Sequence, residues 1–266
     1  MFQGQIIWIT GASSGIGEAV AYEMAQVGAC LILSARRRDE LERVKQACIN
    51  LGQDAENILV LPLDITDEAK LPDIVVSAHA FKGRIDMLYN NAGISQRSLC
   101  IDTDMETYRR LFEVDVFGQI ALTKLVLPIM LGQGEGHIAV TASVAGKIGV
   151  QQRTGYCAAK HAMMGFFDAL RAEVSSAGIF VTTITPGYIR TAISENAITG
   201  DGQTFGKMDD NIKGGMDVQA CARVIMRGFR SRKREIPVGE GKEMQALWLK
   251  RFLPNVLFNM VEKMGN

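Results

Sequence analysis

A tyrosine and a lysine four residues apart are the side chains whose types and spacing most clearly suggest chemistry. They are Tyr156 and Lys160 in TGYCAAKHA, and Ser143 lies thirteen residues before the tyrosine. Positions four apart share one face of a helix, so the Lys160 ammonium is expected beside the Tyr156 phenol. A nearby cation favours the phenolate, which a free tyrosine forms only near pH ~10. Such a tyrosine can exchange a proton with an alcohol or carbonyl oxygen, and a nicotinamide alongside would move a hydride at the same carbon.

A glycine-rich segment near the start of the chain, TGASSGIG over Thr10–Gly17, is the second functional candidate. It follows an apolar run and precedes an amphipathic stretch, so it is expected to join a strand to a helix. Its glycines would let the backbone turn tightly, so that a pyrophosphate rests on free N–H groups at the start of the helix. The spacing GxxxGxG differs from the common dinucleotide fingerprint GxGxxG, and a tight packing turn without a ligand is the alternative.

Short β-branched runs alternate along the chain with longer amphipathic stretches, which predicts an α/β fold with a parallel sheet covered on both faces. The expected strands are Gln5–Thr10, Ala29–Ser34, Asn57–Leu61, Ile85–Tyr89, Gly136–Ala142, Ile179–Ile184 and Glu235–Val238. The expected helices are Gly15–Val27, Asp39–Leu51, Asp67–Ala80, Met105–Leu131, Thr154–Ala177 and Asp217–Phe229, with further helix after Gly241. Residues 188–215 are rich in Gly, Asp, Asn and Thr and lack a strong period, which favours a flap over packed core.

Composition excludes several classes of protein. The chain has 266 residues, 47% of them hydrophobic, and no formal net charge, so a large core is expected and nucleic acid binding is not. Five scattered cysteines without a CxxC pair, and three separated histidines, predict reduced thiols and no metal site. The start MFQGQIIWITG lacks the features of a signal peptide, and no uninterrupted apolar run reaches the ~18 residues of a membrane span. An intracellular, cytoplasmic protein is therefore expected.

The order of these motifs resembles the short-chain dehydrogenase/reductase family. Its landmarks are a TGxxxGxG opening, an Asp after the third strand, NNAG after the fourth, a Ser after the fifth, YxxxK on the next helix and a PG turn after the sixth strand. In this chain they correspond to Thr10–Gly17, Asp64, Asn90–Gly93, Ser143, Tyr156 with Lys160, and Pro186–Gly187. The resemblance covers about residues 5–240 and implies a doubly wound, Rossmann-like domain with a seven-stranded sheet. We expect one catalytic domain over residues 1–240, followed by a helical extension over residues 241–266 that the general family pattern does not explain.

The resemblance also implies a role for each motif. Tyr156 would be the general acid/base and Ser143 would orient and polarise the substrate oxygen, while Lys160 would hold the nicotinamide ribose and assist Tyr156. Taken alone, Ser143 would be interpreted as a strand-end hydroxyl that satisfies the backbone, and Tyr156 with Lys160 as an ordinary amphipathic helix pair; their register with TGASSGIG and NNAG favours the catalytic roles. The implied cofactor-binding residues are Gly11, Ser13, Ser14, Gly15, Ile16, Gly17, Asp64, Ile65, Asn91, Ala92, Gly93, Tyr156, Lys160, Pro186, Gly187, Ile189 and Thr191.

The preferred cofactor can be inferred from charge. An NAD site places a carboxylate on the adenosine ribose about 20 residues beyond the glycines, and that carboxylate would repel a 2′-phosphate. Here the window reads SARRR, without a carboxylate, and Arg36 and Arg37 could bind the phosphate with charge-assisted hydrogen bonds. NADP(H) is therefore expected over NAD(H). The alternative is that ARRRDE is a solvated turn before a helix.

One position departs from the family pattern. An Asn is usual in the helix before the fifth strand, where it supports a water that links the lysine to solvent. This chain has Asp115 there, in the string VDVFG. An ionised carboxylate cannot donate a hydrogen bond, and it would partly neutralise the field of Lys160. We expect Asp115→Asn to retain or raise turnover.

The residues expected around the substrate are mostly apolar: Val144, Val150, Cys157, Tyr188, Ile193 and Met216. They favour a lipophilic carbonyl or alcohol such as a steroid, retinoid or lipid-derived ketone, although Arg153 or Gln151 could receive a polar group. The expected function is an NADP(H)-dependent interconversion of a secondary alcohol with a ketone or aldehyde. The alternative is a catalytically impaired cofactor-binding scaffold, suggested only by Asp115. A serine hydrolase is disfavoured because TASVAG lacks the glycine of a nucleophile elbow.

The end of the chain carries apolar residues at helical spacing, split by Pro254 into two short helices. They are Met244, Leu247, Trp248, Phe252, Val256, Leu257, Met260, Val261 and Met264. This stripe could cover its own domain or a sister subunit, close over the pocket, or lie on a lipid surface. The tail and the string VFGQIALTKLVLPIM are similar to the dehydrogenase/reductase member 7 branch of the family. The family also implies a homodimer or homotetramer, assembled through Met105–Leu131 and Thr154–Ala177.

Overall fold

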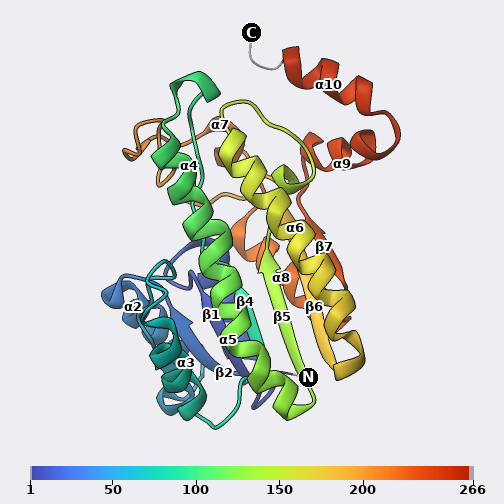
Figure 1. The fold of residues 1–266 in the computed structure, drawn as a ribbon. Helices are drawn as coiled ribbons and strands as arrows, with labels where there is room; N and C mark the ends of the chain where they lie inside the picture. The colour runs from blue at the N-terminus through green and yellow to red at the C-terminus, as the bar shows by residue number, and fades with distance from the viewer. Residues whose placement is uncertain (1, 264–266) are drawn as a thin grey trace.

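A seven-stranded parallel sheet forms the centre of this computed structural model, which describes residues 2–263 (Figure 1). Met1 and residues 264–266, including Met264 of the tail pattern, lie outside the described residues. The strands are β1 (Ile6–Thr10), β2 (Cys30–Ser34), β3 (Ile58–Val60), β4 (Met87–Asn90), β5 (Gly136–Thr141), β6 (Ile179–Pro186) and β7 (Glu235–Val238), in the order β3-β2-β1-β4-β5-β6-β7. The predicted doubly wound α/β fold is confirmed.

Helices cover both faces of the sheet. They are α1 (Gly15–Gln26), α2 (Arg38–Asn50), α3 (Leu71–Ala80), α4 (Met105–Phe112), α5 (Gly118–Gln133), α6 (Thr154–Val174), α7 (Asp210–Lys213), α8 (Val218–Arg230), α9 (Lys242–Phe252) and α10 (Pro254–Lys263). One hydrophobic cluster lies between the sheet and α1, α2 and α8, and a second lies between the sheet and α3, α5 and α6. Because both faces are covered, β1 and β2 are buried along their whole length, which explains their continuous apolar runs.

Two helices differ from the expectation for physical reasons. The helix expected from Asp67 begins at Leu71, and Pro72 stands in its first turn, where the missing N–H of proline costs no hydrogen bond. The helix expected as one regular piece from Met105 contains a π-helical turn over Glu113–Phe117. Such turns insert an extra residue into a helix and often occur at functional sites. Here the turn carries Asp115.

The continuous helix Met105–Gln133 is long and apolar enough, by length and composition alone, to cross a membrane. In this fold 44% of its most apolar window is buried. Its α5 part packs against α3 and the sheet, and α4 packs against α6. We therefore interpret it as a core helix of the domain. The cytoplasmic location and any peripheral membrane contact stay predictions.

The sheet order brings the functional loops to one edge. The chain runs from β1 outward to β2 and β3, then crosses back so that β4 pairs with the other side of β1. Ligands of open α/β sheets bind at this reversal, outside the carboxyl ends of the strands. The glycine segment follows β1, NNAG begins at the end of β4, and Ser143 follows β5. The PG turn stands at the end of β6.

Residues 188–215 lack regular structure apart from α7 and a few isolated bridges. The segment nevertheless contributes to the packed core, contrary to the prediction, because Ser194, Ala197 and Ile198 are buried. The reason is a backbone pairing with the loop after β4. Ile198 N donates to the carbonyl of Ser95 at 2.8 Å, and Arg97 N donates to the carbonyl of Ile198 at 2.9 Å.

The tail forms the two short helices expected around Pro254, α9 and α10. Ala246 and Leu257 pack with Val144 and Ile148, so part of the apolar stripe covers its own domain beside the site. Another part faces outward, at Trp248, Phe252, Leu253, Val256, Phe258 and Met260. Figure 1 shows α10 as the element that extends farthest from the sheet. The division into a domain ending near residue 240 and an extension stays a prediction.

Candidate active site

The glycine segment turns directly from β1 into α1. Gly11 has φ +64°, and a Cβ there would lie 2.9 Å from Ala92 Cα. At Gly17 a Cβ would lie 2.4 Å from the Gly11 carbonyl oxygen, so only glycine allows this approach. Ser14 precedes α1 in an extended conformation, and its side chain caps none of the described N–H groups. The backbone N–H groups of the first turn of α1, at the positive end of the helix, are therefore available to an anion such as a pyrophosphate.

The NNAG segment braces this turn. The backbone amides of Asn91 and Ala92 donate to Thr10 Oγ1 at 3.0 and 3.1 Å, and Asn91 Nδ2 donates to the carbonyls of Thr10 and Gly11 at 3.3 and 3.4 Å. The other side of the Asn91 amide accepts from Thr141 Oγ1 at 3.0 Å. One side chain therefore connects the ends of β1 and β5 through the loop after β4.

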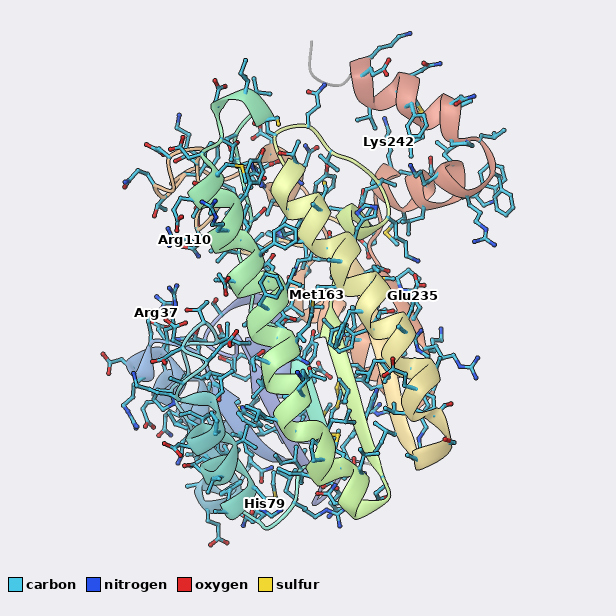
Figure 2. All side chains as sticks on the ribbon, in the orientation of Figure 1. Arg37, His79, Arg110, Met163, Glu235 and Lys242 are labelled. Carbon is cyan, nitrogen blue, oxygen red and sulfur yellow. The ribbon has the colours of Figure 1, made fainter. Side chains whose placement is uncertain are left out.

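The residues expected around the adenosine lie beside β2 and β3. Arg36 and Arg37 are exposed after β2, and Figure 2 shows Arg37 at the outer edge of the molecule beside α2. Ile65 is buried, whereas Asp64 is exposed. Partial burial acts to raise the pKa of Asp64, but hydrogen bonds from Thr66 outweigh it and lower that pKa below its ordinary value. The Asp64 carboxylate therefore remains ionised at neutral pH.

The turn has a further neighbour that the motifs did not predict. Arg43 of α2 donates to the Ser13 carbonyl at 3.2 Å and pairs with Glu18 at 2.7 Å. This contact places a guanidinium against the backbone of the glycine turn. Arg43 is hidden in the sequence because it belongs to an ordinary charged helix face, and only the packing of α2 on α1 brings it there.

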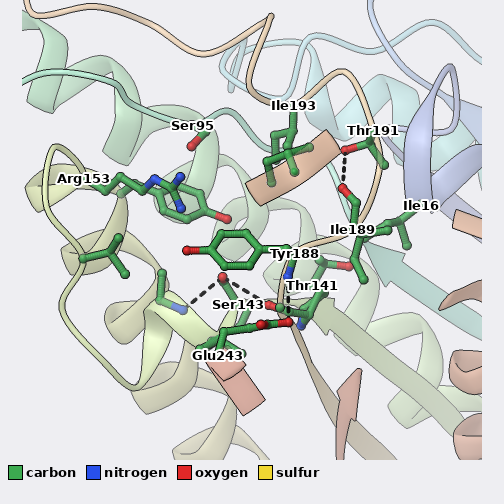
Figure 3. Close-up of a pocket in the computed structure, with 18 of the residues that line it drawn as sticks. Ile16, Ser95, Thr141, Ser143, Arg153, Tyr188, Ile189, Thr191, Ile193 and Glu243 are labelled. Atoms are coloured by element: carbon green, nitrogen blue, oxygen red, sulfur yellow. Dashed lines mark hydrogen bonds between the residues drawn. The ribbon is translucent and has the colours of Figure 1, made fainter. Parts of the chain in front are cut away.

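The serine and the tyrosine meet in one cavity. Ser143 and Tyr156 both line it, with Ser143 delivered by the end of β5 and Tyr156 by the first turn of α6. Ser143 Oγ accepts from Ala145 N at 3.0 Å and donates to the Pro186 carbonyl at 3.4 Å, so the hydroxyl is fixed between β5 and the PG turn (Figure 3).

Lys160 is buried beneath Tyr156. Its Nζ lies 5.6 Å from the centroid of the Tyr156 ring and donates to the Thr141 carbonyl at 3.2 Å. The two side chains therefore point toward the same region, as their spacing on one helix predicts. Gly93 of the NNAG segment packs close to the Lys160 ammonium, because a Cβ at this position would lie 3.3 Å from Lys160 Nζ.

Asp115 is the other charged neighbour of Lys160. It is fully buried, its Oδ1 accepts from Ile94 N at 2.8 Å, and its Oδ2 lies 3.5 Å from Lys160 Nζ. Oδ2 lacks a well-aligned hydrogen bond from any described residue. Burial raises the pKa of Asp115 above its ordinary value, although the charge of Lys160 opposes this. Asp115 therefore lies beside Lys160, as predicted. Its burial disfavours the ionised form of the carboxylate.

The cavity has a volume of about 100 Å³ and opens between the carboxyl edge of the sheet and residues 188–215. Its lining includes the expected cofactor residues Ile16, Pro186, Gly187, Ile189 and Thr191, and the expected substrate residues Val144, Val150, Tyr188 and Ile193. It also includes residues outside the expected set, namely Ser95, Arg97, Ile148, Ile212 and Glu243. Glu243 accepts from Tyr188 N at 3.3 Å and so ties the start of α9 to the site.

Three expected pocket residues lie elsewhere. Cys157 follows Tyr156 on α6, about 100° around the helix, and packs beside Ala145 as a buried thiol outside the lining. Met216 packs against the core on the face of α1 and α8. Gln151 is exposed and donates to the Val261 carbonyl at 3.4 Å, toward α10. The sequence pattern placed them near the site along the chain but carried no information on the direction of their side chains.

Gln96 is a positioning residue that the motifs did not predict. Its Oε1 accepts from Gly155 N at 2.8 Å and from Tyr156 N at 3.3 Å, so a side chain from the loop after β4 caps α6. First-turn amides of a helix lack intrahelical partners, and a buried side-chain acceptor fixes where that turn sits. Gln96 thereby sets the position of the catalytic candidate Tyr156 without lining the cavity.

A comparison with known protein families shows to which family the chain belongs. A family model described as short chain dehydrogenase matches residues 5–203. The chain belongs to the short-chain dehydrogenase family. A human member, named dehydrogenase/reductase SDR family member 7, is 41% identical over 263 residues, which are 98% of this chain and 77% of the human one. Together with similar insect relatives, it places the chain in the member 7-like branch.

Solved structures of short-chain dehydrogenases share the fold. One from Streptomyces avermitilis superposes with a TM-score of 0.83 at 26% identity, covering 99% of this chain and 97% of that one. Another from Burkholderia phymatum, solved in complex with NAD, gives a TM-score of 0.79 at 24% identity, with 89% of each chain covered. As a short-chain dehydrogenase, the protein is an oxidoreductase of a family that uses nicotinamide cofactors and small-molecule substrates.

Proposed function

We propose that this protein is an NADP(H)-dependent oxidoreductase that interconverts a secondary alcohol with a ketone, or a primary alcohol with an aldehyde, with Tyr156 as general acid/base. The observation that carries the proposal is the shared cavity of Ser143 and Tyr156, with the Lys160 ammonium 5.6 Å from the centre of the Tyr156 ring. This combination supplies a proton donor, an oxygen-orienting hydroxyl and a fixed positive charge at one point.

The residues present fit a dinucleotide. The glycines let the turn pack tightly against the loop after β4, and the turn leaves the N–H groups at the start of α1 without a side-chain cap, which suits a pyrophosphate. The PG turn, with Ile189 and Thr191, lines the cavity where the nicotinamide is expected. When bound, the cofactor would donate or accept a hydride at the substrate carbon.

The side chains would handle the proton. In the direction of reduction, Tyr156 Oη donates a proton to the carbonyl oxygen as it becomes a hydroxyl, and in oxidation the phenolate takes that proton back. Ser143 Oγ turns its single hydroxyl proton from the Pro186 carbonyl, a 3.4 Å contact, to this oxygen, while Ala145 N continues to donate to Oγ at 3.0 Å. Lys160 stabilises the negative charge that Tyr156 carries after it gives up its proton.

The preference for NADP(H) rests on the charge after β2. Arg36 and Arg37 are exposed beside the expected adenosine site, and both side chains are free to turn toward a 2′-phosphate. A guanidinium can bind a phosphate with two parallel hydrogen bonds, whereas a ribose hydroxyl gains little from it. The same window offers no carboxylate for the ribose of NAD.

The substrate is proposed to have an apolar body, because Ile16, Val144, Ile148, Val150 and Ile193 all line the cavity. We also keep the proposal of a homodimer or homotetramer. On the long helix expected in such an interface, Met105 and Phe117 are exposed apolar residues. A complementary copy would remove these surfaces from water.

The test is consumption of NADPH and NADH by the purified protein with a panel of carbonyl compounds, including an aryl alkyl ketone, a steroid ketone and the aldehyde retinal. The proposal expects turnover with at least one of these compounds and a roughly tenfold or greater preference for NADPH, the size of one charged hydrogen bond. Tight NADPH binding without consumption, unchanged by Tyr156→Phe, would contradict it in favour of a cofactor-binding scaffold.

A further inference from the structure

Two arginines face the substrate cavity, and both are nearly buried. The side chains of Arg97 and Arg153 are 5% and 11% exposed, and both line the same cavity as Ser143 and Tyr156. Arg97 comes from the loop after β4, and Arg153 precedes α6. A charged side chain is expensive to bury unless an opposite charge and a full set of hydrogen bonds compensate it. The partners of Arg97 and Arg153 therefore show how much negative charge and how many hydrogen-bond acceptors the two arginines have within the protein.

A single carboxylate serves both guanidiniums. Asp209 Oδ2 lies 2.7 Å from Arg153 Nη2 and 3.1 Å from Arg97 Nη2, while its Oδ1 accepts from Asn211 N at 2.9 Å to cap α7. Two cations thus share one anion, which leaves one positive charge uncompensated within this cluster. Burial and then the neighbouring charge of Arg153 lower the pKa of Arg97, as expected for a guanidinium with too little negative charge around it.

One donor of the cluster is unused among the described residues. Arg97 Nη1 donates to Ser95 Oγ at 2.9 Å and to the Gln96 carbonyl at 2.7 Å, but the buried Arg97 Nε has no partner. A buried polar atom without a partner costs free energy that an anionic ligand would recover. Arg153 also lies over the Tyr188 ring at 5.9 Å, which holds its guanidinium in place at the cavity wall.

The other charged residue of the lining, Glu243, keeps its negative charge at a separate part of the cavity wall. It accepts from the backbone amides of Tyr188 and Gly241, both at 3.3 Å. In Figure 3, Arg153 and Glu243 lie on different sides of Tyr188. The cavity is therefore polarised, with its cationic side formed by the arginine pair and an apolar wall formed by residues such as Val144 and Ile193.

We propose that Arg97 and Arg153 form an anion subsite that binds a carboxylate group of the substrate, so that the natural substrate is an oxo or hydroxy acid with an apolar body. This inference rests on the proposed function and specifies its substrate. A carboxylate can pair with the guanidiniums of Arg97 and Arg153, which line the cavity, while Asp209 keeps its cap on α7. Bidentate pairing of arginine with carboxylate supplies both affinity and orientation, and would hold the carbonyl near Tyr156.

The test compares 4-acetylbenzoate with its methyl ester, two aryl ketones of which one carries a carboxylate and the other a neutral ester with one additional methyl group. Binding to the full-length protein with NADP+ present is measured by calorimetry, and reduction is measured with NADPH. The acid should bind roughly tenfold or more tightly than the ester, and kcat/KM should favour the acid by a similar factor. Arg153→Gln should abolish this acid-over-ester ratio, and Arg153→Lys should keep part of it.

Arg110→Gln is the matched control. Arg110, which lies on α4 (Figure 2), also ties the segment 188–215 to the domain, because its Nη1 donates to the Gly202 carbonyl at 3.0 Å. It is not among the residues that line the cavity. Its substitution should leave the acid-over-ester ratio unchanged. Equal binding of acid and ester, or a ratio that Arg153→Gln leaves intact, would overturn the anion subsite.

Failure of the two proposals can be told apart. If the acid binds more tightly but neither ketone is reduced with either cofactor, the subsite stands and the proposed oxidoreductase reaction fails. If the ester binds as tightly as the acid, and both ketones are reduced equally well, the reaction stands and the subsite fails.

Discussion

The cofactor side and the substrate side of this site are built in different ways. At the proposed cofactor site, the contacts within the protein come from backbone atoms held by short motifs, such as the approach of Gly17 to the Gly11 carbonyl. Around the substrate, they come from side chains of segments far apart in the chain, such as Arg97 and Asp209. A site formed mainly by backbone atoms needs certain residue types at fixed spacing, so it can be recognised from the sequence. A site built from converging side chains becomes visible only after folding.

Tyr156 stands where the two sides meet, so its loss should have the largest effect. Tyr156→Phe removes the proton donor but keeps the ring and its packing. Turnover should fall by roughly 10²–10⁴-fold, the usual contribution of general acid–base catalysis, while NADPH affinity changes little. Steady-state kinetics with a ketone and a separate binding titration measure the two quantities. Comparable turnover in the variant would show that another group carries the proton.

The next largest effect is expected at the edge of the cofactor side. Arg36→Ala and Arg37→Ala should each weaken NADPH binding by about 1.5–3 kcal/mol for a lost charged hydrogen bond, with NADH little affected. Arg38→Ala is the matched control, because Arg38 is equally exposed and pairs at 3.5 Å with Glu42. Fluorescence titration with both cofactors checks this. An equal loss for NADPH and NADH would mean that these arginines do not recognise the 2′-phosphate.

A backbone-built site should also be intolerant of a single methyl group. Gly17→Ala places a Cβ 2.4 Å from the Gly11 carbonyl and 2.5 Å from Asn91 Nδ2, and should cost about 1–3 kcal/mol in unfolding free energy through overpacking. It should weaken both cofactors alike. Gly132→Ala is the control, because a Cβ there meets nothing within 4 Å and alanine favours the helix α5. Denaturant unfolding of both variants measures the difference, and equal stability would show that the turn can relax.

These expectations explain why some of the molecule was predictable. The alternation of apolar runs and amphipathic stretches predicted all seven strands, since parallel strands buried on both faces must be apolar throughout. The TGxxxGxG and NNAG strings predicted a packed turn, because a Cβ at Gly11 or Gly17 has no room. The spacing of Tyr156 and Lys160 predicted their shared face, because helix geometry is local.

The substrate side was less predictable for the same physical reason. Arg97 and Glu243 were missed because their contacts join segments separated by many residues, and nothing local distinguishes them from surface charges. Cys157 and Met216 were misplaced because proximity in sequence does not give the direction of a side chain. The π-helical turn around Asp115 was also missed, since it depends on how the helix packs rather than on its periodicity.

Asp115→Asn is expected to have the smallest effect. The amide oxygen can still accept from Ile94 N, and the negative charge beside Lys160 disappears, so turnover near pH 7 should stay equal or rise. Burial raises the pKa of Asp115, so the folded protein holds this proton more tightly than the unfolded chain. That stabilisation is present at low pH and is lost as pH rises through the raised pKa.

The Asn variant lacks this titration. Its unfolding free energy relative to the native protein should therefore increase as pH rises from about 4 toward 7. Denaturant unfolding at several pH values, alongside steady-state turnover, tests both parts. A large loss of turnover would show that the carboxylate takes part in the proton path from Lys160.

The most direct test of the central claim follows the hydride. The native protein is incubated with NADPH that carries deuterium at the transferable position of its nicotinamide, together with a ketone that it binds, and the product is analysed by mass spectrometry. The proposed reaction predicts an alcohol with one deuterium on the former carbonyl carbon, which the native protein forms and Tyr156→Phe nearly fails to form. An alcohol without deuterium, or no alcohol from any ketone despite bound NADPH, would contradict it.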